Sequence, residues 1–118
     1  MSSETLNFEQ MPSTDPDLHI YKLRGPLVLG NMFEFQSMLR ANNASAILDL
    51  TEVPYLDSAG IGLIVNSYIA RQKAGRKLLL AGANDRVSTL IKVTRLENVF
   101  EVFPTVEAAT RAISRNVA

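Results

Sequence analysis

Short apolar runs alternate with amphipathic stretches along the chain. Two of these runs, Ala46–Leu50 and Lys77–Ala81, are almost wholly apolar, which is typical of strands covered on both faces of a sheet. Two earlier segments rich in strand-forming residues, around Leu6–Gln10 and Leu18–Arg24, predict a pair of strands separated by a Pro-rich turn. The segment Val99–Phe103 predicts the last strand.

Amphipathic stretches between these runs predict helices. Asn31 followed by Glu34 resembles a capping box that opens a helix ending near Ala41. The longest helix is expected from Ser58 to about Lys73, with Gly75 as its C-terminal stop. Apolar residues recur along it at helical spacing and predict its buried face: Ile61, Ile64, Val65, Tyr68 and Ile69.

Two further helices complete the pattern. Asn84-Asp85 can cap the first of them, and Pro104-Thr105 can open the second. Their apolar faces are Val87, Leu90 and Ile91, and Val106, Ala109, Ile113 and Val117. The resulting order, β-β-α-β-α-β-α-β-α, predicts an α/β fold with a small mixed sheet that is mostly parallel after the first strands. At 118 residues, the chain is expected to form a single domain over residues 1–118.

Composition narrows the function classes. Twelve basic and twelve acidic residues give a formal net charge of zero, so we expect no direct binding of nucleic acid or of an anionic membrane. The absence of cysteine excludes disulfides and cysteine catalysis, and a single histidine makes a metal site improbable. No apolar run is long enough to span a membrane, and the N-terminus lacks signal-peptide features. The expectation is a soluble cytoplasmic protein.

The neutral total conceals an uneven distribution of charge. Residues 1–59 hold eight acidic and three basic residues, whereas residues 60–118 hold four acidic and nine basic residues. Such a split can give a charged face for a partner, unless folding mixes the two halves. We interpret a basic cluster as a solvated helix end that suits the helix dipole, in preference to a nucleic-acid site: Arg71, Lys73, Arg76 and Lys77.

The segment around Ser58 holds the most informative candidate chemistry. It follows a predicted buried strand, and strand-to-helix loops lie at the carboxyl edge of such sheets, where α/β folds place their sites. At the start of a helix, free N–H groups and the positive dipole end favour an anion such as a phosphate on Ser58. Ala59 and Gly60 are small enough to let another protein approach closely. The alternative is that Asp57 or Ser58 serves only as a helix cap.

The same segment resembles a known family signature. Leu56-Asp57-Ser58-Ala59-Gly60-Ile61-Gly62, preceded by Ala46-Ile47-Leu48-Asp49-Leu50, is similar to the STAS domain, and more narrowly to bacterial anti-sigma factor antagonists. The resemblance extends from about Leu18 to Ile113. It implies a non-catalytic phosphoprotein without a cofactor that controls transcription by partner switching.

The resemblance also implies partners and contact residues. An anti-sigma factor that is a serine kinase would phosphorylate Ser58, bind the unphosphorylated form and so release the sigma factor, and a metal-dependent serine phosphatase would reset the cycle. The expected contact residues surround Ser58: Tyr55, Asp57, Ala59, Gly60 and Ile61. The main alternative is a STAS scaffold subunit without this cycle, either stressosome-type or transport-associated. The sequence leaves the oligomeric state open, with a homodimer among the options.

The chain departs from the family pattern after the second strand. Many members carry acidic residues there, whereas Gly25–Gly30 contains none. Leu27 and Val28 would then be either exposed interface residues or loop residues tucked onto the core.

Two other function classes fit the residues less well. A hydrolase elbow needs glycine where Leu56 stands, and the only candidate base is His19, in a strand predicted at the sheet edge. A nucleotide module needs more than the partial Gly60-Ile61-Gly62, because Val65 breaks the dinucleotide fingerprint and no P-loop is present. Weak nucleotide binding at the helix start stays open.

Overall fold

The computed structural model describes residues 4–115, and these contain every element that the pattern predicts. The elements follow in the order β1 (Asn7–Met11), β2 (Leu18–Arg24), α1 (Phe33–Ala41), β3 (Ser45–Glu52), α2 (Ser58–Lys73), β4 (Leu78–Ala81), α3 (Asp85–Val93), β5 (Glu101–Phe103) and α4 (Val106–Arg115). The predicted order is therefore confirmed, and the bounds of β2 and α2 are those read from the sequence.

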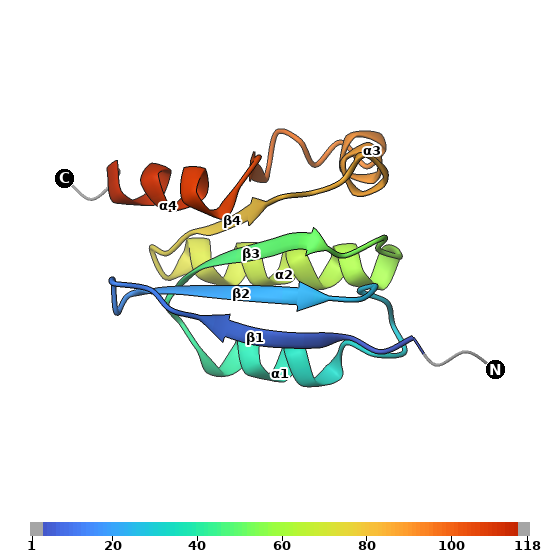
Figure 1. Cartoon of the computed structure of the whole chain (residues 1–118), viewed down its shortest axis with the longest axis horizontal. Helices are drawn as coiled ribbons and strands as arrows, with labels where there is room; N and C mark the ends of the chain where they lie inside the picture. Colours follow the sequence, from blue (N-terminus) through green and yellow to red (C-terminus); the bar gives the residue numbers. More distant parts are fainter. Residues whose placement is uncertain (1–3, 116–118) are drawn as a thin grey trace.

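The strands lie in one sheet in chain order, β1-β2-β3-β4-β5 (Figure 1). β1 pairs antiparallel with β2, and the remaining pairs are parallel. The parallel register sets Tyr21, Leu48 and Leu80 side by side in the middle of the sheet. Because β1 folds back along β2, His19 lies in an internal strand, and the prediction that it occupies the sheet edge is wrong.

Helices cover the sheet unequally. One face carries the larger core, to which α1, α2 and α3 all contribute, and Phe35 lies at its centre with its ring 6.2 Å from Tyr21 and 5.1 Å from Phe8. The opposite face is covered by α4, whose Ala109 and Ile113 pack in a smaller cluster with strand residues. This arrangement confirms the mixed α/β architecture. Val117, predicted on the inner face of the last helix, lies outside the described residues.

The expected capping box at Asn31 is wrong. α1 begins at Phe33, and its N-cap Met32 makes no side-chain capping bond. The Asn31 side chain instead closes the preceding loop, where its amide donates to the Pro26 carbonyl and its oxygen accepts from the Val28 N–H. A local spacing match could not distinguish a helix cap from a loop closure, because the same side chain can satisfy either set of backbone groups.

The buried face of α2 is rotated from the predicted one. Ile61 and Ile64 are buried as expected, whereas Ile69 is 42% exposed. Arg71, expected at a solvated helix end, is only 5% exposed, because α1 packs along this side of α2 and offers its carbonyl groups to the guanidinium. Burial lowers the pKa of Arg71 below its ordinary value.

Candidate functional site

Ser58 is an exposed residue at the start of α2, directly after the loop that leaves β3. That loop is anchored to the domain, because Val53 and Leu56 are both buried in the larger core. Leu56 also forms a parallel bridge with Leu27, which extends the β2–β3 pairing past the bulge at the end of β2. The serine therefore stands on a rigidly supported edge of the sheet.

Asp57 connects the start of α2 to the loop after β2. One carboxylate oxygen, Oδ1, accepts from the Gly60 N–H at 2.8 Å and caps the helix. The other, Oδ2, accepts from the Leu29 N–H at 3.0 Å. Because Asp57 is the cap, Ser58 is not needed for that role. The carboxylate also fixes the position of a loop that is 28 residues away in the chain.

Gly60 allows this loop to rest directly on the helix. A Cβ at this position would lie well under 3.0 Å from the Leu27 carbonyl oxygen and 3.3 Å from the Leu27 Cγ. The same carbonyl accepts from the Asp57 N–H at 3.3 Å. Only glycine provides this close approach of backbone to helix, which explains its place two residues after Ser58.

The loop after β2 exposes a different residue from those expected. Leu27 is fully buried, so the prediction of an exposed contact at this residue is wrong, and the alternative of a residue tucked onto the core holds. Val28 is half-buried. The exposed apolar side chains are Leu29, at 61%, and Phe33 in the first turn of α1, at 71%.

The predicted contact residues divide into two groups. Tyr55, Asp57 and Ala59 are half-buried and reach the surface beside Ser58, whereas Gly60 and Ile61 are buried. The expectation that Ile61 offers its side chain to a partner is therefore wrong, because this side chain packs into the core. One neighbour was not predicted from the sequence: Arg86 comes from α3 and places its guanidinium 4.7 Å from the centre of the Tyr55 ring.

The charges of the two halves of the chain do not cancel by pairing. Glu52 pairs with Lys22 at 3.1 Å and with Arg24 at 3.6 Å, and all three belong to the first half. The hydrogen bond that the Arg24 guanidinium donates to the Glu9 carboxylate is the main cause that raises the pKa of Arg24. Of the ion pairs that the side chains of residues 4–113 form, none joins the acidic half to the basic half. The carboxylate next to Ser58 is engaged by backbone N–H groups.

Ser58 and His19 are not placed to form the nucleophile and base of a serine hydrolase. His19 stands at the start of β2 and Ser58 follows the end of the parallel strand β3, so about 20 Å of sheet separates them. His19 Nδ1 is instead 2.9 Å from the Tyr21 hydroxyl. Among the described residues, no group of three or more His, Asp or Glu side chains could hold a metal ion. No helix in this part of the chain is both long and apolar enough to cross a membrane.

Removing the Asp57 carboxylate should loosen both of its contacts. We expect Asp57→Ala to lower the free energy of unfolding by about 1–2 kcal/mol, because the helix loses its N-cap. We also expect faster hydrogen exchange at the Leu29 amide, which loses its acceptor. Asp57→Asn is the matched control, since one amide oxygen can keep the Gly60 bond while the Leu29 bond is lost. Equal protection of the Leu29 amide in wild type and both variants would contradict this linkage.

Known proteins are similar to this chain over most of its length, including the segment around Ser58. The family model for the STAS domain matches residues 10–109. The anti-sigma-B factor antagonist of Listeria monocytogenes is 36% identical over 55 residues, which is 47% of this chain and 48% of that protein. The match thus spans about half the length of that relative. The anti-sigma-B factor antagonist of Staphylococcus aureus is 26% identical over 101 residues, covering 82% of this chain and 94% of that protein.

Solved structures share the fold at lower identity. A putative anti-sigma factor antagonist from Thermotoga maritima has a TM-score of 0.78 at 22% identity and covers 91% of this chain and 94% of its own. The unphosphorylated anti-sigma factor antagonist SpoIIAA has a TM-score of 0.79 at 14% identity, covering 95% and 100%, and its phosphorylated form from Bacillus has one of 0.71. SLC26A9 has a TM-score of 0.75 at 19% identity, over 86% of this chain and 20% of that one.

Proposed function

This chain belongs to the STAS domain family, and from that premise we propose that it is an anti-sigma factor antagonist controlled by phosphorylation of Ser58. Unphosphorylated, it binds an anti-sigma factor that is a serine kinase, and the sigma factor is released. Phosphorylation of Ser58 by that kinase ends the complex, and a metal-dependent serine phosphatase restores the binding form. The antagonist names of the Listeria and Staphylococcus relatives support this function.

One observation supports the switch above the others: an exposed serine stands at the start of α2 on a surface whose other parts are held in place. Asp57 caps the helix and holds the Leu29 amide, so neither the helix start nor the adjoining loop needs Ser58 for its conformation. A phosphate can therefore be added and removed without refolding the domain. The two states differ in charge at one position of the surface.

The surface around Ser58 has the composition of a contact region for a partner. Leu29, whose amide is bonded to Asp57, is exposed and apolar, and Phe33 is exposed four residues further along the chain. Tyr55 adds an aromatic ring that Arg86 covers on one side. Aromatic and arginine side chains are enriched where protein partners bind most tightly. In place of the acidic residues that many family members carry after the second strand, this chain offers an apolar contact centred on Leu29.

Phosphorylation would oppose binding by electrostatics. A phosphoserine carries about −1.5 to −2 charges at neutral pH. Within a contact that includes Leu29 and Phe33, that charge would lose water without gaining a partner, at a cost on the order of several kcal/mol. The neighbouring Asp57 carboxylate adds a like charge. The same phosphate faces the positive end of the α2 dipole, so the isolated domain tolerates it.

Two variants of Ser58 test the switch. We expect Ser58→Ala to bind the cognate anti-sigma kinase with an affinity within about threefold of wild type, because the interface stays uncharged. We expect Ser58→Asp to bind at least about tenfold more weakly, which corresponds to about 1.4 kcal/mol. Isothermal titration calorimetry with the purified kinase measures both, and mass spectrometry after incubation with kinase and ATP locates the phosphate.

The matched control is Ser13→Asp. Ser13 is an exposed serine in the turn between β1 and β2, which lies at the other edge of the sheet from Ser58. It adds the same charge to the molecule, and we expect binding to remain as in wild type. Equal affinities for Ser58→Ala and Ser58→Asp would eliminate the switch. Phosphate found on another residue, with Ser58 unmodified, would eliminate the assigned position.

A scaffold role without a phosphorylation cycle is the second candidate. The observation in its favour is that the same fold forms part of SLC26A9, whose name is not that of an antagonist. For a scaffold role we expect a large homo-assembly in gel filtration and no modification by a cognate kinase. For an antagonist we expect a small species in gel filtration and phosphate incorporated at a single serine.

A further inference from the structure

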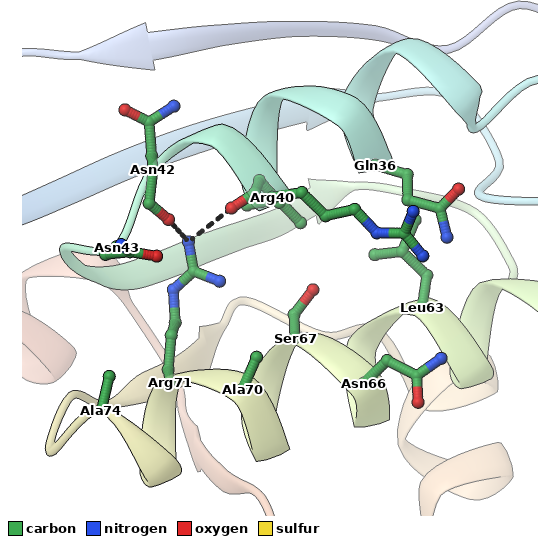
Figure 2. Close-up of a pocket in the computed structure, with 11 residues that line it drawn as sticks. Gln36, Arg40, Asn42, Asn43, Leu63, Asn66, Ser67, Ala70, Arg71 and Ala74 are labelled. Carbon is green, nitrogen blue, oxygen red and sulfur yellow. Dashed lines mark hydrogen bonds between the residues drawn. The ribbon is translucent and has the colours of Figure 1, made fainter.

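A polar groove of about 300 Å³ runs between α1 and α2 (Figure 2). Two arginines line it, Arg40 from α1 and Arg71 from α2. Figure 2 shows Arg40 extending over the groove toward Leu63, while Arg71 rises from the opposite side. The remaining polar lining is amide and hydroxyl side chains: Gln36, Asn42, Asn43, Asn66 and Ser67.

The Arg71 guanidinium is only partly used by the fold. Its Nε donates to the Ala44 carbonyl at 3.0 Å, and its Nη2 donates to the carbonyls of Asn42 at 3.0 Å and Leu39 at 3.4 Å. These bonds attach the end of α1 to α2. The other terminal nitrogen, Nη1, points over Ala70 into the groove (Figure 2). A donor group of a buried cation is therefore directed at the groove.

The described part of the chain provides no counter-ion for the positive charge of the groove. Neither Arg40 nor Arg71 pairs with a carboxylate within residues 4–115, and no acidic side chain lines the groove. Buried charges in proteins are usually paired, since carbonyl dipoles offset only part of the cost of desolvation. Burial accordingly lowers the pKa of Arg71. An anion in the groove would stabilise this cation directly.

We propose that the groove between α1 and α2 binds the phosphate group of a small phosphomonoester, with Arg40 and Arg71 as the cationic contacts and Ser67 as a hydroxyl donor. Arginine matches phosphate better than a point charge does, because its planar donors meet two oxygens at once. The two negative charges of a phosphomonoester dianion balance the two positive charges of the guanidinium groups. The volume lies at the lower end of small-molecule sites, which favours a compact ligand over a chain segment.

This site is separate from the switch. Ser58 and Arg71 lie near opposite ends of α2, about 20 Å apart along its axis. The groove therefore does not depend on the proposed function, and binding there can be measured on the unphosphorylated domain. A ligand at the groove would contact both α1 and α2, and α2 is the helix that begins at Ser58.

Nuclear magnetic resonance titration of the whole chain tests the proposal. The probes are glycerol 3-phosphate, inorganic phosphate and acetate, each added at constant ionic strength at pH 7.5. We expect saturable shifts at the Arg71 Nε–H and the Ser67 amide with glycerol 3-phosphate, and affinity at least about fivefold weaker in Arg40→Gln. Tighter binding of inorganic phosphate than of the ester would identify the free ion as the ligand with the same contacts.

Arg111→Gln is the matched control, because Arg111 is an exposed arginine on α4, which covers the other face of the sheet. It removes one positive charge from the molecule, and we expect no change in affinity. Arg40 is exposed, so its replacement should leave the fold intact, which amide spectra of the free variant verify. Identical titrations of wild type and Arg40→Gln, or shifts with acetate equal to those with the ester, would overturn the proposal.

Discussion

Gly60→Ala is expected to destabilise the domain by about 2–3 kcal/mol, although alanine is the better helix former. The added Cβ would meet the Leu27 carbonyl oxygen, a backbone atom with no freedom to rotate away. That carbonyl accepts from the Asp57 N–H, and Leu27 bridges Leu56, so moving the loop would disturb both contacts. A fall in the melting temperature of roughly 10 °C should follow.

Gly62→Ala is the matched control for this effect. Gly62 lies two residues further along α2, and a Cβ there meets nothing within 4 Å. The expected result is a gain of up to about 1 kcal/mol, because glycine inside a helix costs conformational entropy. Urea unfolding followed by circular dichroism measures both variants. If the two substitutions changed stability in the same direction and by similar amounts, the close approach of Leu27 would not be what requires glycine.

Arg71→Met should cost about 2–3 kcal/mol. Methionine keeps most of the side-chain length but donates to none of the three carbonyls that Arg71 now satisfies at Leu39, Asn42 and Ala44. Each hydrogen bond from a charged donor is worth about 1.5–3 kcal/mol. Removing the buried charge returns part of that sum, because the guanidinium no longer needs to be desolvated. The unfolding midpoint in urea reports the net effect.

The neighbouring residue provides the control for Arg71. Gln72 follows it on α2 and is exposed, so Gln72→Ala should change stability by no more than about 0.5 kcal/mol. Hydrogen exchange adds a local measurement. In Arg71→Met we expect protection to fall at the end of α1, around residues 39–42, before it falls in the sheet. Unchanged protection there would show that the carbonyls find other donors and that the guanidinium is not what joins the helices.

Most of the architecture could be read from local patterns. β3 and β4 were predictable because strands covered on both faces exclude polar residues, and Ala46–Leu50 and Leu78–Ala81 are apolar almost throughout. The start of α2 was predictable because Asp57 is a strong cap directly before a helical pattern. Ser58 could be singled out for the same reason, and because its flanking residues match a family signature.

Predictions were wrong where one segment met another far away in the chain. The capping box at Asn31 was wrong because its amide donates to the Glu4 carbonyl, 27 residues away in the chain, as well as to the loop after β2. The exposed contact expected at Leu27 was wrong because this residue bridges Leu56. Nothing near Leu27 in the sequence indicates that bridge, since the two residues are joined only by folding.

The distribution of charge was likewise decided by the fold and could not be read from the sequence. From the sequence, the acidic half and the basic half could have mixed or stayed apart. In the structure the ion pairs of the described residues stay within each half, and Glu52 pairs with Lys22 and Arg24 across neighbouring strands. Arg86, a cation of the second half, lies over the ring of Tyr55 beside Ser58.

The sequence by itself determined the order of strands and helices, the α/β class and the serine at the start of α2, because periodicity and helix caps act over a few residues. Only the tertiary structure decided that Leu29 and Phe33 are exposed, that Gly60 supports the Leu27 carbonyl, and that Arg71 is buried beneath α1. Each of these depends on how close two distant segments lie, and local pattern does not encode that distance.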